Sequence, residues 1–138
     1  EDGVATHKEI EKEFGADVAF LVEGVTKLGK LKYHGEQRHV ENLRKMFFAM
    51  AQDIRVVLIK LADRLHNMQT LEHVSKLKQK RIADETLEIY APIADRLGMG
   101  KFKATLENLA FPFAFPDEYH ALAQKIKDRL EKKEVYSR

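Results

Sequence analysis

Three polar residues at helical spacing, Asp63, Asn67 and Thr70, are the strongest candidates for chemistry in this sequence. On a helix of about 100° per residue they fall within roughly 80° of arc and span about 10 Å along the axis. A carboxylate, an amide and a hydroxyl on one face supply a metal-binding oxygen and neutral hydrogen-bonding groups. We therefore expect them to line a wet cleft of nucleotide size.

The helix predicted over residues 54–70 carries apolar side chains on two sides. One set falls in an arc about 100° wide and comprises Ile54, Val57, Leu58, Leu61, Leu65 and Met68. On the opposite side, Val56 and Ile59 begin a stripe that continues as the three polar residues. The β-branched start would also suit a strand, but the helical period decides for helix. A helix apolar on two sides is expected to run through the middle of a bundle.

A carboxylate on such a helix needs a compensating charge, because desolvation of an isolated anion is costly. The sequence leaves two explanations open for Asp63. One is ligation of a metal ion, and the other is an internal ion pair with Arg44, Lys60 or Arg64.

The other polar residues point to no specific site. The six histidines form no His-Glu-x-x-His helix or other close metal spacing, and we interpret His66 as structural. The basic segments over residues 27–38 and 76–81 are typical of solvated surface. Glu1 and Asp2 form an acidic pair at the start of the chain, where disorder is common.

Composition suits one helical domain. The 138 residues are 44% hydrophobic and 33% charged, and the net charge of +2 gives no general reason to bind nucleic acid or a membrane. The absence of cysteine excludes disulfides and thiolate chemistry and fits a reducing cytosol. No apolar run reaches the roughly 18 residues of a membrane span. Because the chain starts without Met or a signal-peptide pattern, we expect an excised or processed piece.

Local signals predict an all-α bundle. A capping box from Thr6 to Glu9 opens a helix that ends at Gly15, and a second helix runs from there to a basic loop over residues 27–35. Further helices are expected over residues 36–52 and 54–70. Another should begin at about residue 75, and Pro92 should end or kink it. A short turn stops at Gly98. One more helix should cover residues 101–111, and a last helix should begin at Pro116.

Five blocks of the sequence, in this order, closely resemble the hydrolase domain of the bifunctional RelA/SpoT enzymes. They are residues 1–3 (EDG), 21–28 (LVEGVTKL), 41–46 (ENLRKM), 53–68 (DIRVVLIKLADRLHNM) and 88–92 (EIYAP). The resemblance covers residues 1–111. Residues 112–138 resemble the start of a helical connection toward the family's synthetase domain.

The resemblance implies an all-α helical bundle of the HD superfamily and hydrolysis of the alarmone (p)ppGpp at its 3′ end with Mn²⁺. It implies that Asp63 is a metal ligand and that Glu1 and Asp2 orient or deprotonate the attacking water. Asn67 and Thr70 match residues that contact the nucleotide. The implied partners are a guanosine polyphosphate and an adjoining synthetase domain. The resemblance implies no direct binding to nucleic acid or to a membrane. The implied location is the bacterial cytoplasm or a plastid.

In that family an upstream His and a His-Asp pair supply three of the four protein ligands, and the pair lies four residues before the acidic residues matched by Glu1 and Asp2. We therefore expect residues 1–111 to be most of the hydrolase domain, without its N-terminal helices, and expect the isolated chain to be inactive. A regulatory HD domain without catalysis is the alternative hypothesis. A generic helical scaffold with Asp63 in an ion pair is a third.

Overall fold

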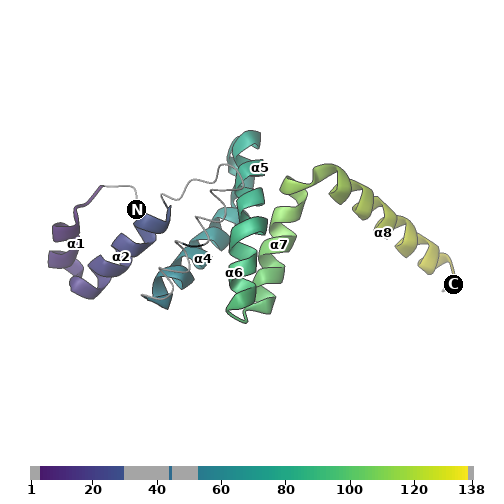
Figure 1. Ribbon diagram of the computed structural model, residues 1–138. Helices are drawn as coiled ribbons and strands as arrows, with labels where there is room; N and C mark the ends of the chain where they lie inside the picture. Colours follow the sequence, from purple (N-terminus) through teal and green to yellow (C-terminus); the bar gives the residue numbers. More distant parts are fainter. Residues whose placement is uncertain (1–3, 30–43, 45–52, 137–138) are drawn as a thin grey trace. The chain divides into compact units, whose positions relative to one another are not determined.

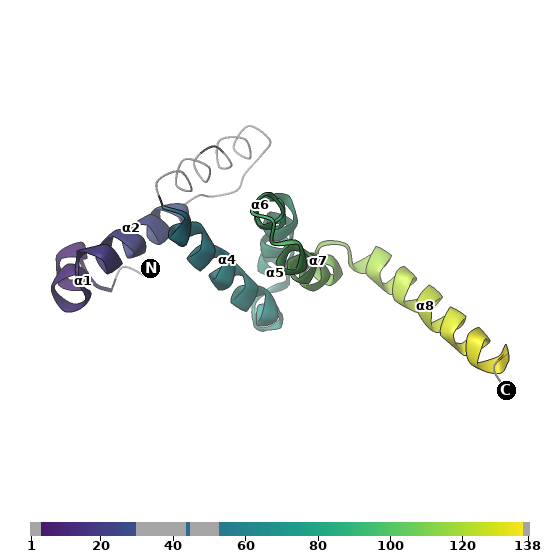
Figure 2. The ribbon, with the colours of Figure 1, turned by 90° about the horizontal axis from the view of Figure 1, so that it is seen from below.

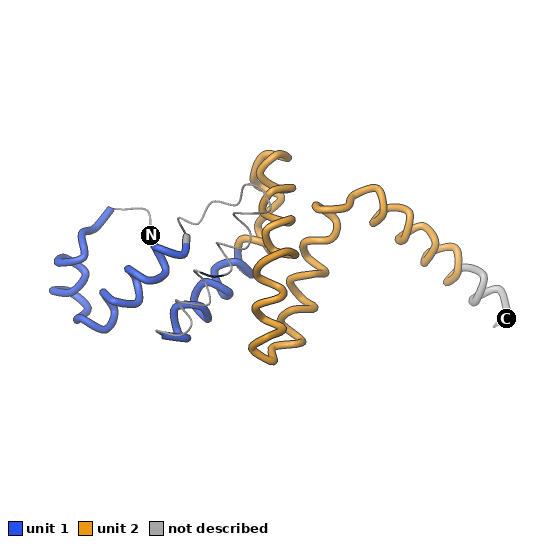
Figure 3. The backbone as a smooth tube through the Cα atoms, viewed as in Figure 1, with its two compact units in different colours: residues 1–66 blue, residues 67–138 orange. Residues whose placement is uncertain are grey.

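All regular elements of the computed structural model, which describes residues 4–29, 44 and 53–136, are helices (Figure 1). The prediction of an all-α fold is confirmed. The chain divides into two compact units, residues 1–66 and 67–138 (Figure 3). Helix α4 (Ile54–Gln69) begins in the first unit and ends in the second.

The first unit opens with the predicted capping box. Helix α1 (His7–Phe14) begins after Thr6, whose hydroxyl accepts a hydrogen bond from Glu9 N at 3.4 Å, while Glu9 Oε2 accepts one from Thr6 N at 2.7 Å. The helix ends at Gly15, whose φ of 88° is one that L side chains rarely adopt. Helix α2 (Ala16–Gly29) then packs against α1.

The predicted start of the basic loop is wrong by several residues, because α2 continues to Gly29. Lys27 Nζ lies 2.6 Å from Glu23 Oε1, one helical turn earlier, and Leu28 is buried. This ion pair and the burial of Leu28 support helix where a composition rich in Lys and Gly suggested a loop. The rest of that loop and the helix predicted over residues 36–52 lie outside the described residues, except for Arg44, which is helical.

Helix α4 (Ile54–Gln69) begins where the sequence predicts, after Asp53, whose Oδ1 accepts a hydrogen bond from Arg55 N at 2.9 Å. Its buried face is rotated from the predicted one, because Ile54, Leu58 and Ile59 are more than 40% exposed. The buried residues of α4 are Val56, Val57, Lys60, Leu61, Arg64 and Met68. Two cations thus occupy positions on the buried side, while part of the apolar pattern faces outward.

In the second unit, a short 3₁₀ turn, η1 (Leu71–His73), leads into a continuous run of helix. It comprises α5 (Lys76–Glu85), a π-helical turn η2 (Thr86–Tyr90) and α6 (Ala91–Arg96). Pro92 neither ends nor breaks this run. The wide turn η2 immediately precedes it, which accommodates a residue without a backbone N–H.

Helix α7 (Gly100–Ala114) folds back along this run after a turn at Gly98, whose φ is 74° (Figure 1), and Figure 2 shows α5, α6 and α7 side by side, seen end-on. The core between them includes Ala83, Thr86, Ile89, Ile93, Ala94, Leu106 and Ala110. Helix α7 extends past its predicted end at Phe111 and includes Pro112. Helix α8 (Pro116–Tyr136) begins at the predicted proline. In the described part of the chain no helix is long and apolar enough to cross a membrane.

Candidate active site on helix α4

Asp63 lies in α4, and its side chain is 35% exposed. Its Oδ2 accepts a hydrogen bond at 3.0 Å from the Nζ of Lys60, which lies three residues earlier on the same helix. The residue Lys60 is itself only 6% exposed. Of the partners that the sequence offered for an ion pair, the structure selects this one.

The second carboxylate oxygen of Asp63 is open. Within the described residues, Oδ1 of Asp63 has no hydrogen-bond or ion-pair partner, and the side chain reaches solvent. An anionic oxygen that faces water is a suitable donor for a hard divalent cation. Asp63 is therefore in a position to contribute one ligand without giving up its contact with Lys60.

The described residues supply this one ligand and no complete metal site. Among residues 4–29, 44 and 53–136, no group of three or more His, Cys, Asp or Glu side chains could hold a metal ion. Hydrolases of the HD class depend on a metal ion. Glu1 and Asp2, the acidic pair singled out in the sequence, lie outside the described residues.

Asn67 and Thr70 follow Asp63 toward the end of the helix. Asn67 is one helical turn beyond Asp63 in α4 and is exposed, so its amide faces solvent. Thr70 lies just past the last helical residue, and its hydroxyl donates a hydrogen bond of 3.5 Å to the carbonyl of Asn67. The helix therefore presents the carboxylate and the amide at i and i+4, and the hydroxyl comes from the turn that follows.

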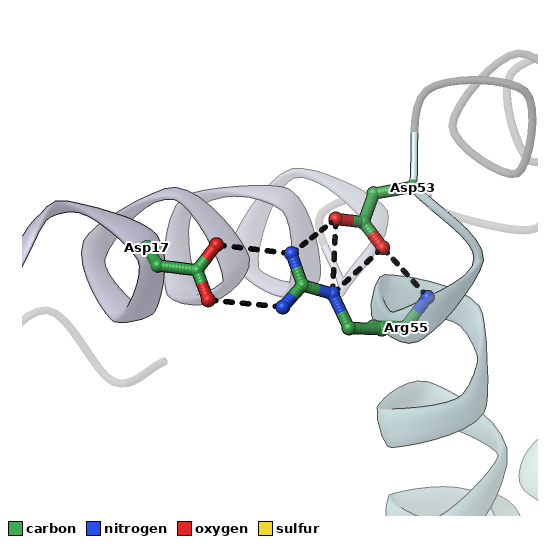
Figure 4. A network of polar contacts seen from close by, with 3 residues as sticks. All are labelled: Asp17, Asp53 and Arg55. Atoms are coloured by element: carbon green, nitrogen blue, oxygen red, sulfur yellow. Dashed lines mark hydrogen bonds and ion pairs between the residues drawn. The ribbon is translucent and has the colours of Figure 1, made fainter.

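An ion-pair network at the other end of α4 went unnoticed in the sequence (Figure 4). The guanidinium of Arg55 donates two hydrogen bonds to Asp17 of α2, at 2.9 and 3.0 Å, and further hydrogen bonds of 2.7 to 3.1 Å to Asp53. Asp17 and Arg55 are 38 residues apart in sequence, so no local spacing could reveal the pair. Paired donors of this kind fix orientation, and here they tie the start of α2 to the start of α4.

Arg55 also sets the protonation of both carboxylates. Its side-chain hydrogen bonds and positive charge hold the pKa of Asp17 below its usual value. The pKa of Asp53 is lowered by the side-chain hydrogen bonds from Arg55 and then by the hydrogen bond from the Arg55 backbone. Both carboxylates in turn raise the pKa of Arg55. The network therefore stays fully charged at neutral pH.

The first unit also contains a hollow of about 220 Å³ whose lining is apolar. It is lined by apolar side chains of α2 and α4, namely Val18, Leu21, Val22, Val25 and Ile59. Four of these residues lie on α2, and Ile59 lies on α4. A lining without charged groups does not suit a nucleotide phosphate, so the polar face of α4 remains the candidate site.

Comparisons with known proteins agree with the sequence blocks. The HD domain family matches residues 1–100. A GTP pyrophosphokinase of Myxococcus xanthus is 52% identical over 140 residues, which cover 99% of this chain and 18% of that protein. The bifunctional (p)ppGpp synthase/hydrolase SpoT of Escherichia coli K12 is 52% identical over 128 residues, covering 92% of this chain and 18% of that protein.

A third relative is the guanosine-3′,5′-bis(diphosphate) 3′-pyrophosphohydrolase of Aquifex aeolicus, which is 49% identical over 138 residues. These residues cover 100% of this chain and 20% of that protein, so the chain spans about a fifth of the length of these relatives. Because the family match covers most of the chain and the helices agree with an all-α fold, this chain belongs to the HD domain family, in the branch formed by the RelA/SpoT proteins.

Proposed function

We propose that this chain is part of a (p)ppGpp 3′-pyrophosphohydrolase that removes pyrophosphate from the 3′ end of a guanosine polyphosphate. The observation that carries the proposal is Asp63. It is a partly exposed carboxylate with one open oxygen on α4, within the longest block that resembles the hydrolase family. Relatives named as 3′-pyrophosphohydrolases match almost the whole chain at about half identity.

Each candidate residue has a distinct role in this proposal. Asp63 would hold a divalent cation, which we propose to be Mn²⁺, through its carboxylate. Glu1 and Asp2 would orient the attacking water and accept its proton, as an acidic pair can do when it lies within hydrogen-bond reach of the water. A bound cation would lower the pKa of that water and would neutralise negative charge on the pyrophosphate.

The two polar groups beyond Asp63 would orient the substrate. The exposed amide of Asn67 has both donors and an acceptor, and the hydroxyl of Thr70 can donate or accept, so both suit ribose or phosphate oxygens. Neutral donors of this kind fix orientation without adding charge to a site that also binds a cation.

The proposal also covers the rest of the protein. We infer that residues 112–138 lead toward a synthetase domain, since one relative is named a bifunctional synthase/hydrolase and the relatives are about five times longer than this chain. Helix α8, which forms most of this segment, begins at Pro116 after the end of α7. We propose a cytoplasmic location of bacterial type, with a plastid as the alternative.

The test is hydrolysis of ppGpp by the full-length protein with Mn²⁺, compared with its Asp63→Asn variant. Removal of a group that merely supports a metal ligand typically lowers metal affinity by about 10- to 100-fold. Because Asp63→Asn removes the proposed ligand itself, we expect it to lower the affinity for Mn²⁺ by at least about 100-fold. Asp84→Asn is the matched control. Asp84 is also a partly exposed helical carboxylate that contacts a lysine, at 3.2 Å from Lys80 Nζ.

We expect the control variant to keep both Mn²⁺ binding and pyrophosphate release. Unchanged Mn²⁺ affinity in Asp63→Asn would remove this carboxylate from the metal site and overturn the proposal. We also expect a polypeptide limited to these 138 residues to release no pyrophosphate, because Asp63 is the one residue in it that matches a metal ligand of the family. Mn²⁺-dependent release by that polypeptide would contradict this assignment of ligands.

A non-catalytic regulatory HD domain is the second candidate. It is favoured by the relative named GTP pyrophosphokinase, which matches 99% of this chain. In that case the full-length protein would bind a guanosine polyphosphate without releasing pyrophosphate, whatever divalent cation is added. The same hydrolysis assay therefore distinguishes the two candidates.

A further inference from the structure

The joint between α7 and α8 depends on one residue. The chain turns sharply here (Figure 1), and Phe115 is the single residue between the two helices. Its φ of −133° and ψ of 66° are not helical. The Phe115 N–H donates a hydrogen bond of 2.9 Å to the carbonyl of Phe111, and the Phe115 carbonyl accepts one of 2.9 Å from the Tyr119 N–H. The direction in which α8 leaves α7 therefore follows from the backbone angles of Phe115.

Lys80 of α5 reaches this joint from a distant part of the sequence. Its Nζ donates a hydrogen bond of 3.1 Å to the carbonyl of Ala114, the last residue of α7, and lies 5.9 Å from the centre of the Phe115 ring. The last carbonyls of a helix have no partner within the helix and carry partial negative charge. A lysine ammonium group suits both such a carbonyl and the face of an aromatic ring. Lys80 therefore contacts the two residues at which α7 ends.

Asp84 helps to hold the ammonium group of Lys80 in place. Both carboxylate oxygens of Asp84, one helical turn later on α5, lie 3.2 Å from Lys80 Nζ. With the Ala114 carbonyl they make three acceptors, equal in number to the three N–H donors of an ammonium group. The Lys80 side chain is 60% exposed, so the ammonium group can return to water without leaving a buried charge behind. The contact with the joint is therefore reversible.

Aromatic rings support the same turn of the chain. The ring centre of Phe111 lies 6.0 Å from that of Phe115 and 6.0 Å from that of Tyr119, and the second pair meets edge to face. Aromatic rings in such arrangements attract each other. Because Phe111 belongs to α7 and Tyr119 to α8, these rings join the two helices directly. The contact from α5, in contrast, depends on a charge.

We propose that Lys80 is a latch: its charged ammonium group holds the joint between α7 and α8 closed and so couples the direction of α8 to α5. Loss of the positive charge releases the joint, and the direction of α8 is then less restricted. The proposed site on α4 takes no part in this arrangement, so the latch stands or falls independently of the proposed function.

An ordinary surface ion pair predicts a different result. Exposed lysine–carboxylate pairs one turn apart in a helix contribute little to stability. If Lys80 served only to pair with Asp84, removal of either charge would have the same small effect. If Lys80 is a latch, removal of its charge affects the joint more than removal of the Asp84 charge does, because Asp84→Asn leaves the hydrogen bond to Ala114 in place.

The experiment measures hydrogen–deuterium exchange in the full-length protein by mass spectrometry. Peptides spanning residues 113–121 contain the amides of Phe115 and Tyr119, whose hydrogen bonds close the joint. Lys80→Met keeps an unbranched stem and removes the charge. We expect it to speed exchange in these peptides at least about threefold, since loss of one hydrogen bond shifts a local opening equilibrium by about this factor. Lys80→Arg keeps a charged donor and should stay within about twofold of the unchanged protein, with Asp84→Asn between the two.

Lys78→Met is the matched control, because it removes another exposed lysine of α5, and it should leave exchange over residues 113–121 unchanged. Residues 103–110 of α7, which include the buried Leu106 and Ala110, are the internal reference and should exchange at the same rate in every variant. Circular dichroism establishes that each variant is folded.

Three results would overturn the inference. The first is unchanged exchange over residues 113–121 in folded Lys80→Met. The second is equal acceleration over residues 103–110, since Lys80 would then stabilise the second unit as a whole. The third is acceleration by Lys80→Arg or Asp84→Asn as large as that by Lys80→Met, which would leave no special role for the lysine charge at the joint.

Discussion

Gly24 of α2 lies directly against Val56 of α4. A Cβ atom placed on Gly24 would be 2.8 Å from Val56 Cγ2 and 3.1 Å from Val56 Cγ1. Real Cβ atoms essentially never approach other atoms within 3.0 Å, so the two helices meet here only because residue 24 has no side chain. Val56 is buried, which leaves little room for it to move aside. This contact helps to hold the helix that carries Asp63.

Gly24→Ala should therefore destabilise the protein, by about 1–3 kcal/mol as is typical of overpacking. Denaturant unfolding monitored by circular dichroism measures the change. Gly100→Ala is the matched control, because a Cβ at this helical glycine meets no atom within 4 Å, and we expect it to be neutral or stabilising by up to about 1 kcal/mol. Adding Val56→Ala to Gly24→Ala should restore part of the lost stability relative to the two separate effects. A Gly24→Ala variant as stable as the unchanged protein would contradict the close contact.

Acid should weaken the link between α2 and α4 at Arg55. The pKa of Asp17 is lowered mainly by the hydrogen bonds from Arg55, so the folded state binds its proton less readily than the unfolded state does. Stabilisation of this sign is present above the ordinary aspartate pKa of about 4 and is lost as the pH falls through the lower folded-state value. We expect Arg55→Gln to lower the Tm at pH 7 and the difference to shrink below about pH 4.

Lys27→Gln serves as the comparison, since it removes a single surface pair with Glu23. Arg55 contacts two carboxylates, so the Arg55 variant should show the larger change in Tm at pH 7. Thermal unfolding at several pH values tests this. A Tm difference for Arg55→Gln that persists unchanged at pH 2 would argue against the ionic origin of the effect.

The core of the second unit should be sensitive at Leu106. This side chain is completely buried, and Leu106→Ala should cost about 2–5 kcal/mol of unfolding free energy because it leaves a cavity. Leu77→Ala deletes the same atoms from a residue that is 85% exposed, and we expect a change of no more than about 0.5 kcal/mol. Chemical denaturation of both variants compares them directly. Similar losses at the two positions would mean that the packing of α7 is not as the structure has it.

Asn67 should affect substrate binding without affecting the metal. If its amide contacts a charged phosphate, loss of that hydrogen bond is worth about 1.5–3 kcal/mol, so Asn67→Ala should raise the KM for ppGpp by about 10- to 100-fold. The Kd for Mn²⁺ should stay the same, because an amide at this position is not among the proposed ligands. Asn108→Ala, at an exposed position of α7, is the control. Loss of Mn²⁺ binding in Asn67→Ala would instead assign its amide to the metal site.

Much of the fold could be predicted because its signals are local. The capping box at Thr6, the helix end at Gly15 and the start of α8 at Pro116 each depend on residues within one turn of one another, and all three are confirmed. The roles of Glu1, Asp2, Asp63, Asn67 and Thr70 stay predictions. For these residues the sequence supplies the chemical types and the family resemblance, which are properties of the chain alone.

Tertiary structure decided which charged side chains pair with each other and which face of α4 is buried. Helical spacing places Lys60 one turn before Asp63, but the burial of Lys60 depends on the residues that pack around it. The pairing of Arg55 with Asp17, 38 residues away, and the outward turn of Ile54 and Leu58 likewise depend on how helices pack. Periodicity reports which residues share a face of a helix, whereas the neighbours that cover that face are set by contacts between distant parts of the chain.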